Sequence, residues 1–207
     1  DITKVGVLGE GPINDKSSLI LSSRLSYFGT ILKKIAEKKE EFSVTSAPEF
    51  NDFYLQYNYK LDKDENFTFE AITSQDTLEF IVKEGRDPKI EGDISNDTSF
   101  YRLIPRYQKK ISEKLNFDVS LGYGKDNIKF QVSDRYFDLL NYNFSQIAEL
   151  TYDSSAKMTT IFGLDSQYRD FRVQIKLPDF NSQGGVFTPG GTETISAIKI
   201  VYAGLHT

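Results

Sequence analysis

Side chains alternate in character along Asn51–Glu70, and this alternation strongly restricts the possible fold. Phenylalanine, leucine and tyrosine take every second position of the first arm, and most residues between them are polar. Because a β-strand points successive side chains to opposite faces, the pattern predicts a strand with one apolar face. The polar run Asp62–Asn66 follows, and the alternation resumes at Phe67 and Phe69. We therefore predict a β-hairpin with a tight turn.

Similar stretches recur along the chain and predict nine strands. The clearest of them is Leu115–Tyr123, where every second residue is apolar or aromatic. Gly9–Pro12 is expected to break or bulge the first strand, because proline cannot donate a backbone hydrogen bond. The predicted strands are residues 2–8, 17–27, 51–61, 67–73, 98–111, 115–123, 142–152, 157–171 and 192–205.

The connections between these strands alternate in length. Short turns follow the first, third, fifth and seventh strands, whereas the others are followed by long segments, namely residues 28–49, 74–97, 124–141 and 172–191. Within them, residues 30–42 predict a short helix, and residues 128–132 could continue the sixth strand or form an extra hairpin arm. An up-and-down sheet would place all short turns at one end and all long loops at the other. Outer-membrane barrels show this asymmetry, and soluble sandwiches with Greek-key connections have no reason to show it.

Composition and charge narrow the classes of protein. The chain has 16 Phe, 12 Tyr and no Trp, a net charge of -5 and no cysteine. The absence of a basic stripe argues against a nucleic-acid partner. No apolar run approaches the length of a transmembrane helix, but alternating barrel strands would not produce such a run.

We predict an all-β fold, specifically an antiparallel, up-and-down transmembrane β-barrel segment of about nine strands. Residues 1–207 would form part of one barrel domain, with the four long segments as external loops. Several predicted strands have the 9 to 11 residues that a tilted strand needs to cross the hydrocarbon. Single-chain bacterial barrels have even strand numbers, so we expect the remaining strands in a longer chain or another copy.

The segment Gly9–Leu32 resembles an early barrel hairpin of the TonB-dependent outer-membrane receptors. Glu10-Gly11-Pro12, the turn Asp15-Lys16 and the strand end Arg24-Leu25-Ser26-Tyr27 correspond to that family's pattern, with Leu25 in place of a second arginine. The order of later motifs is also similar to the family, and these motifs are Tyr57-x-Tyr59-x-Leu61, Phe100–Leu103 and Gly163–Arg169.

The resemblance implies a large barrel that imports scarce nutrients, is plugged by an N-terminal domain and is driven by TonB. It places the protein in the outer membrane of a bacterial cell. The implied partners are outer-membrane lipid, the remaining strands and plug of a longer chain, and TonB through that plug. No plug domain is recognisable in these 207 residues. Two alternatives stay open, a soluble β-sandwich that binds carbohydrate or protein and an outer-membrane anchor in a surface assembly that does not transport.

The sequence predicts no enzyme and no cofactor, and it nominates no catalytic, cofactor-binding, metal-binding or ligand-binding residue. The lone histidine, His206, lies near the end of the sequence. Asp62–Asn66 begins like a calcium loop, but Phe67 and Thr73 replace the required glycine and glutamate. Gly122–Gly124 is expected to ease packing at a bend in the sheet. Six residues are expected near loop ends, where they could bind a ligand or anchor an interface, and these are Tyr101, Arg102, Arg106, Tyr136, Tyr168 and Arg169.

Overall fold

The computed structural model describes residues 4–29, 31, 49–82, 92–132, 135–155, 157–179 and 188–206. At 80–82, 92–93, 177–179, 188–192 and 206 only the backbone is described. The strands are β1 (Lys4–Asn14), β2 (Ser17–Ser26), β3 (Glu49–Asp62), β4 (Glu65–Val82), β5 (Gly92–Ser112), β6 (Leu115–Val132), β7 (Arg135–Ser155), β8 (Met158–Asp179) and β9 (Thr188–His206).

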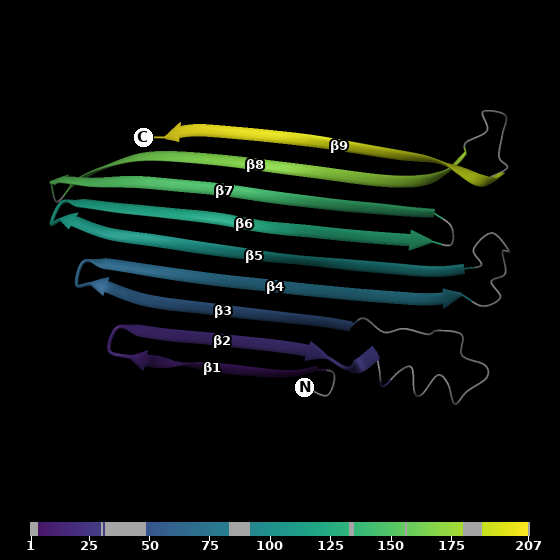
Figure 1. Ribbon diagram of the computed structural model, residues 1–207, viewed down its shortest axis with the longest axis horizontal. Coiled ribbons are helices and arrows are strands. Elements are labelled where there is room, and N and C mark those ends of the chain that lie inside the picture. Colours follow the sequence, from purple (N-terminus) through teal and green to yellow (C-terminus); the bar gives the residue numbers. More distant parts are fainter. Residues whose placement is uncertain are drawn as a thin grey trace.

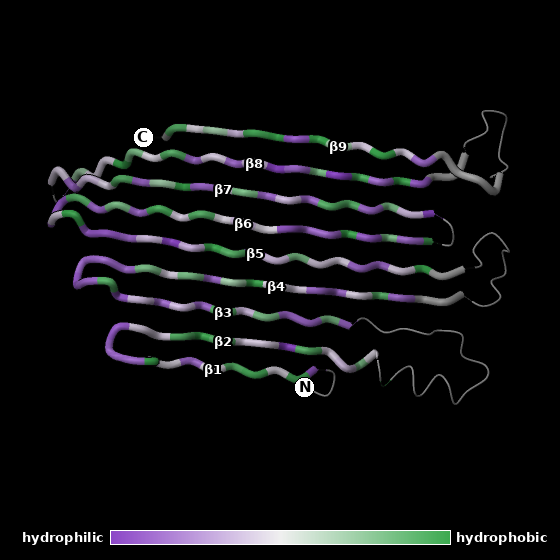
Figure 2. The backbone as a smooth tube through the Cα atoms, viewed as in Figure 1, coloured by the Kyte–Doolittle hydropathy of each residue, from purple (hydrophilic) through white to green (hydrophobic). Residues whose placement is uncertain are grey.

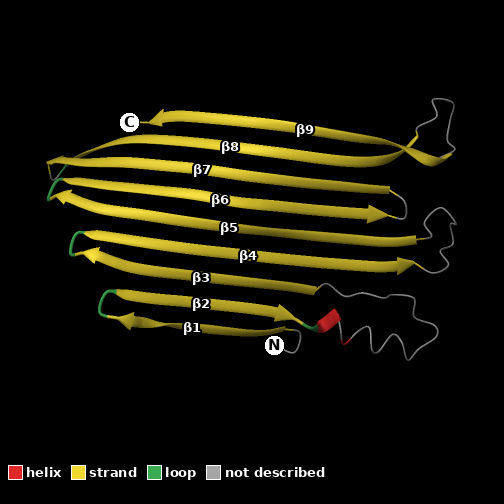
Figure 3. Cartoon of the chain, viewed as in Figure 1, coloured by secondary structure: helices red, strands yellow, loops and turns green. Residues whose placement is uncertain are grey.

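These strands form one antiparallel sheet in sequence order, so each strand pairs with the strands before and after it (Figure 1). Figure 3 shows the sheet as a single layer with β1 and β9 at its two edges. The prediction of nine antiparallel strands in up-and-down order is confirmed. The described strands form an open sheet that does not close on itself.

Three of the four predicted long loops are largely strand, which corrects their boundaries. Residues 74–82 and 92–97 belong to β4 and β5, residues 124–132 and 135–141 to β6 and β7, and residues 172–179 and 188–191 to β8 and β9. In the remaining segment, 28–49, Glu49 opens β3 and the Ile31 amide donates to the Tyr27 carbonyl oxygen at 3.2 Å. Residues 32–48, which include most of the predicted helix and its Lys–Glu run at 33–41, lie outside the described residues.

The cross-strand register assigns every paired side chain to one of two faces, because directly opposed residues share a face. Away from the bulges, face A carries the odd-numbered residues of β1 to β6 and β9 and the even-numbered residues of β7 and β8. Face B carries the others. Residues of both kinds, hydrophilic and hydrophobic, alternate along each strand in Figure 2.

The loop predictions were wrong because the alternation continues with its polarity reversed. In β6, Val119 and Leu121 point to face A, whereas further along the strand Ile128 and Phe130 point to face B. The polar residues of the far part, such as Lys129, therefore occupy the face that is apolar earlier in the strand. A search for one continuous apolar face therefore ends β6 at this reversal, about half-way along the strand.

The four short turns, at one end of the sheet (Figure 1), share one construction. Each begins with a side-chain oxygen that accepts a hydrogen bond from a backbone amide in the turn, as Asn14 Oδ1 does from Lys16 N at 2.9 Å. The corresponding acceptors in the other turns are Asp62, Ser112 and Ser155. Asn, Asp and Ser favour turns through such bonds, so these residues specify where the hairpins reverse.

Hydrogen bonds also join each of the first three turns to the following hairpin. The amide of Lys60 donates to the carbonyl oxygen of Lys16, and the amide of Lys110 donates to that of Asp64, each at 2.8 Å. Asp153 donates to Lys114 in the same way, also at 2.8 Å. In each case the bond continues the ladder with the preceding strand by one residue past its last pair, which involves Tyr59, Lys109 or Tyr152.

Four prolines lie within the described strands, namely Pro12, Pro105, Pro178 and Pro189, and the ladder adapts at the first two as follows. A break or a bulge was expected at Gly9–Pro12. The break is wrong, because β1 runs through these residues, whereas an irregularity is found beside Pro12, where the register shifts between Pro12 and Asn14. Pro105 pairs with Phe69 of β4, but pairing with β6 stops at Leu103 and resumes at Arg106. The missing N–H of proline accounts for this local gap.

Candidate functional site

Face A carries an apolar band over the half of the sheet nearest the short turns. In register across the sheet, Leu21 of β2 lies beside Leu55 of β3, followed by Ala71 of β4 and Leu103 of β5. The band continues on β6 with Val119 and Leu121, which is 36% exposed. Gln146 and Ser166 interrupt the row that contains Leu121. The rest of the band is made by Phe69, Ala148, Leu150, Leu164, Val201, Ala203 and Leu205.

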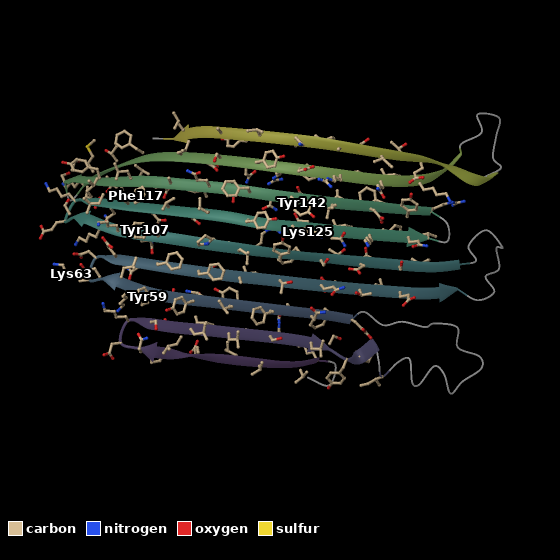
Figure 4. The ribbon with its side chains drawn as sticks, viewed as in Figure 1. Tyr59, Lys63, Tyr107, Phe117, Lys125 and Tyr142 are labelled. Atoms are coloured by element: carbon tan, nitrogen blue, oxygen red, sulfur yellow. The ribbon has the colours of Figure 1, made fainter. Side chains whose placement is uncertain are left out.

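Aromatic residues line both borders of this band. At the turn border the Tyr107 ring lies against the Phe117 ring, with centroids 6.4 Å apart, and Tyr59 lies in the same region (Figure 4). At the opposite border the Tyr101 and Tyr123 rings are 6.0 Å apart. The remaining border residues are Phe53, Phe67, Tyr142, Phe144, Tyr152, Phe162 and Tyr168.

Beyond the second aromatic border, face A becomes polar. Lys125 marks this transition, with its Nζ 5.7 Å from the centroid of the Tyr142 ring (Figure 4). Past it lies a hollow of about 590 Å³ lined chiefly by polar side chains from β4 to β8, including Glu79, Asp97, Lys129 and Asp138. The outer part of face A therefore suits water, in contrast to the band.

Face B is polar opposite the band. One polar cluster on this face centres on Arg102, which donates from Nη1 to the carbonyl oxygens of Tyr101 at 2.7 Å and Lys125 at 3.1 Å. Its Nη2 pairs with Asp126. Asp126 Oδ2 accepts a second bond, at 2.8 Å, from the amide of Asn141, whose side chain is almost fully buried. One carboxylate thus links strands β5, β6 and β7.

A second charged cluster lies on face B nearer the turns. Arg106 donates from Nε to Asp118 Oδ1 at 2.9 Å and from Nη2 to Oδ2 at 2.5 Å, which is a two-pronged pairing. Gln108 adds a bond to the same carboxylate at 2.7 Å. Beside this cluster is an open hollow of about 410 Å³ that also has Glu149 and Lys110 in its lining. The hollow carries charges of both signs and has no preference for one kind of ion.

The six residues expected near loop ends are divided between the two faces. Tyr101, Tyr136 and Tyr168 lie on face A, and Arg102, Arg106 and Arg169 lie on face B. The expectation of loop ends is wrong for all but Tyr136, the second residue of β7, because the strands extend well past the others. Tyr101 and Tyr168 lie at the border of the band.

The other residues discussed from the sequence, His206, the turn at Asp62–Asn66 and Gly122–Gly124, are located as follows. His206 ends β9, where its backbone pairs with Gly163. Asp62 and Glu65 flank the two-residue turn between β3 and β4, as predicted for a hairpin. Gly122 and Gly124 lie within β6 and leave room for Ser145 and for Arg102, respectively, which agrees with the predicted packing role.

Metal chemistry finds no support in the part of the chain that the structure describes, where no group of three or more histidine, cysteine or carboxylate side chains could hold a metal ion. Among the same residues, no helix has the length and apolar character needed to cross a membrane.

No protein-family model matches the sequence, and no curated protein matches it. The function proposed below is therefore based on the geometry of the two faces of the sheet.

Proposed function

We propose that this sheet is part of the wall of an outer-membrane β-barrel, with the apolar band of face A directed at lipid and face B directed at the lumen. The observation that carries the proposal is the reversal of polarity along the strands. An antiparallel sheet in a soluble protein commonly keeps its apolar residues on one face, because that face packs on a core. A wall that leaves the membrane needs an apolar outer face only where lipid is present.

The dimensions of the band support this proposal. On β7 the aromatic border residues Tyr142 and Tyr152 are ten residues apart on the same face, which corresponds to about 33 Å along the strand. With a strand tilt of about 40°, the height becomes about 25 Å, the usual height of the apolar band in such barrels. Strands β4 to β9 have 18 to 22 residues, so they would project well beyond the membrane on one side.

The two-layer alternative, a soluble sandwich, requires a second sheet over the band. The described residues form one layer, and Phe162 and Leu164 of the band are 54% and 37% exposed. Such exposure over a wide area is unusual for a protein surface in water. It is the expected state of a surface that faces lipid.

The transport role that we propose is uptake of a ligand by a receptor of the TonB-dependent type. It is supported by the resemblance of Glu10–Pro12, Asp15-Lys16 and Arg24–Tyr27 to that family, and these segments form the first hairpin of the sheet. The polar clusters around Arg102 and Arg106 would line the lumen.

The membrane proposal is tested by moving one charge along a single strand. Leu121→Arg places a cation in the centre of the band, and Asn127→Arg places the same cation on the same face beyond the aromatic border. Arginine at the bilayer midplane costs about 2–4 kcal/mol and near the interface about 0–1 kcal/mol. We expect Leu121→Arg to reduce the amount of folded protein in the outer-membrane fraction severalfold, while Asn127→Arg leaves it unchanged. Equal tolerance of both substitutions would contradict the proposal.

A further inference from the structure

On face B, past the level of the lipid band, lies an apolar patch that the proposed wall does not require. Two complete cross-strand rows make up this far apolar patch. The first row is Ile128, Leu139 and Val173, and the second is Phe130, Phe137 and Ile175. Phe130 is 44% exposed in the described structure. A lumen mouth that held only water would be expected to have polar residues here, as face B has nearer the turns.

One free positive charge lies at the border of this patch. On face B of β8, Arg169, Phe171 and Val173 follow one another at every second residue. Arg169 is therefore two positions on this face away from the patch residue Val173. Arg169 is exposed and makes no hydrogen bond or ion pair with any described residue. Its neighbours across the ladder, Asn143 and Ile200, carry no charge.

In having no partner among the described residues, Arg169 differs from four other arginines of the sheet. Arg24, Arg102, Arg106 and Arg172 each pair with an aspartate. An exposed guanidinium beside apolar side chains complements an acidic group that is attached to an apolar body, because arginine binds carboxylates and phosphates in two-pronged fashion.

The size of the patch favours a small molecule over a protein. Three strands at about 4.8 Å spacing and four residue steps of about 3.3 Å give an area of about 200 Å². A stable protein interface buries about 800 Å² on each partner, several times more than the patch offers. An area of this size matches one wall of a ligand site, where apolar side chains hold the body of the ligand and a few polar groups orient it.

We propose that the far apolar patch and Arg169 form a binding site for an anionic amphiphile, a molecule with a hydrocarbon or aromatic body and one carboxylate or phosphate group. The acidic group binds the Arg169 guanidinium, and the body lies on Val173, Ile175 and Phe137. The inference deepens the proposed uptake function by naming its class of ligand, and it rests on face B being the lumen side.

The test uses the full natural polypeptide in phosphatidylcholine nanodiscs, with empty nanodiscs as the blank. The probes are 11-(dansylamino)undecanoic acid and its methyl ester, which differ in the acidic group alone, and binding is followed by dansyl fluorescence. We expect saturable binding of the acid and weaker binding of the ester. Arg169→Gln should weaken binding of the acid about tenfold, the loss expected for one charge-assisted contact, and should leave the ester unchanged.

Two further variants control the experiment. Arg172→Gln removes a nearby arginine of the same strand, but one on face A, and should leave both probes unaffected. Val173→Asp should abolish binding of both probes. Since Val173→Asp could impair folding, Arg169→Gln at an exposed position provides the decisive comparison. Equal affinity for acid and ester, insensitivity to Arg169→Gln, or no saturable binding because a polypeptide covers the patch would each overturn the inference.

This outcome is separable from that of the membrane proposal. A protein that distinguishes Leu121→Arg from Asn127→Arg in the outer membrane but fails to bind the probe retains its proposed location and loses only the ligand assignment. A protein that fails the membrane comparison loses both.

Discussion

The side chain of Arg102 on β5 lies across Gly124, its partner on β6, at a distance that leaves no space for a methyl group. A Cβ at Gly124 would lie 2.5 Å from Arg102 Cδ and 2.5 Å from the carbonyl oxygen of Tyr101. The glycine therefore lets the guanidinium lie flat on face B, where it reaches Asp126 and two backbone carbonyl oxygens.

Gly124→Ala should disrupt this arrangement. The Arg102 side chain can move aside, but the Tyr101 carbonyl oxygen belongs to the backbone of the paired strand and cannot move freely. We expect a loss of about 1–3 kcal/mol in the free energy of unfolding, as for overpacking elsewhere, measured by denaturant titration. Gly9→Ala is the matched control, because nothing lies within 4 Å of a Cβ at Gly9. Equal stability of the two variants would show that the Arg102 cluster is not held in this geometry.

The pair Arg106–Asp118 is suited to a double-mutant cycle. The side chains are about half and one quarter exposed, and both carboxylate oxygens accept bonds from the guanidinium. We expect a coupling energy of about 1 kcal/mol between Arg106→Leu and Asp118→Leu, at the upper end for exposed pairs because of the two-pronged geometry. Arg106→Lys should lose most of this coupling, since lysine cannot make both contacts. A coupling near zero would mean that solvent separates the two groups.

The side chain of Asn14 is expected to stabilise the first turn. Asn14→Ala removes the acceptor for Lys16 N and should destabilise the first hairpin by about 0.5–1.5 kcal/mol. The effect should appear as faster amide hydrogen exchange in β1 and β2. Asn14→Asp keeps an oxygen acceptor, as Asp62 does in the second turn, and should preserve protection. If the amides of β1 and β2 exchange at the same rate in Asn14→Ala and Asn14→Asp, the hydrogen bond to the Asn14 side chain does not determine the stability of the turn.

Tyr136 and Glu193 provide a pH-dependent link across β8. The Tyr136 hydroxyl of β7 donates to Glu193 Oε1 of β9 at 2.7 Å, and this bond to a carboxylate raises the pKa of Tyr136 above its ordinary value of 10.0. The neutral phenol is thus favoured in the folded state. Its contribution to stability is fully present below pH 10 and is lost as the pH rises through the raised pKa.

Tyr136→Phe should therefore be slightly less stable than the natural protein from pH 7 to 9, and the difference should shrink at higher pH. Thermal unfolding at several pH values measures it. Tyr142→Phe is the comparison, because the Tyr142 hydroxyl makes no hydrogen bond with a carboxylate of the described residues and the ring instead lies beside Lys125. A difference that stays constant to pH 12 would argue against the link.

Much of the fold could be predicted from the sequence because short-range alternation and turn chemistry encode it. The hairpin around Asp62–Asn66 and the position of Leu115–Tyr123 on one apolar face agree with the structure. The ends of the strands could not be predicted by following one apolar face, because Lys125 and Asn127 continue the strand with reversed polarity. Of the two predictions for residues 128–132, continuation of the sixth strand is confirmed, since β6 runs to Val132. Its signal is the alternation of Ile128, Phe130 and Val132, which lie on the other face.

The polar site was less accessible to sequence reasoning. The sequence predicts Arg102, Arg106 and Arg169 only near loop ends and nominates none of them as a site. Their shared face depends on the registers between strands. The partners Asp118 and Asp126 come from another strand and carry no local signal. Which side chains become neighbours on adjacent strands depends on the register of the strands. A shift of one residue would move every side chain of a strand to the other face.

The hydrogen bonds from turn to turn have a consequence for how the sheet assembles. Every strand contacts its sequence neighbours, so the contact order is low for a β protein, and low contact order favours rapid folding. A completed turn presents the Lys16, Asp64 or Lys114 carbonyl oxygen as a template for the next hairpin. The sheet can therefore grow by adding one hairpin at a time, each docking on the one before it, as repeat proteins propagate from unit to unit.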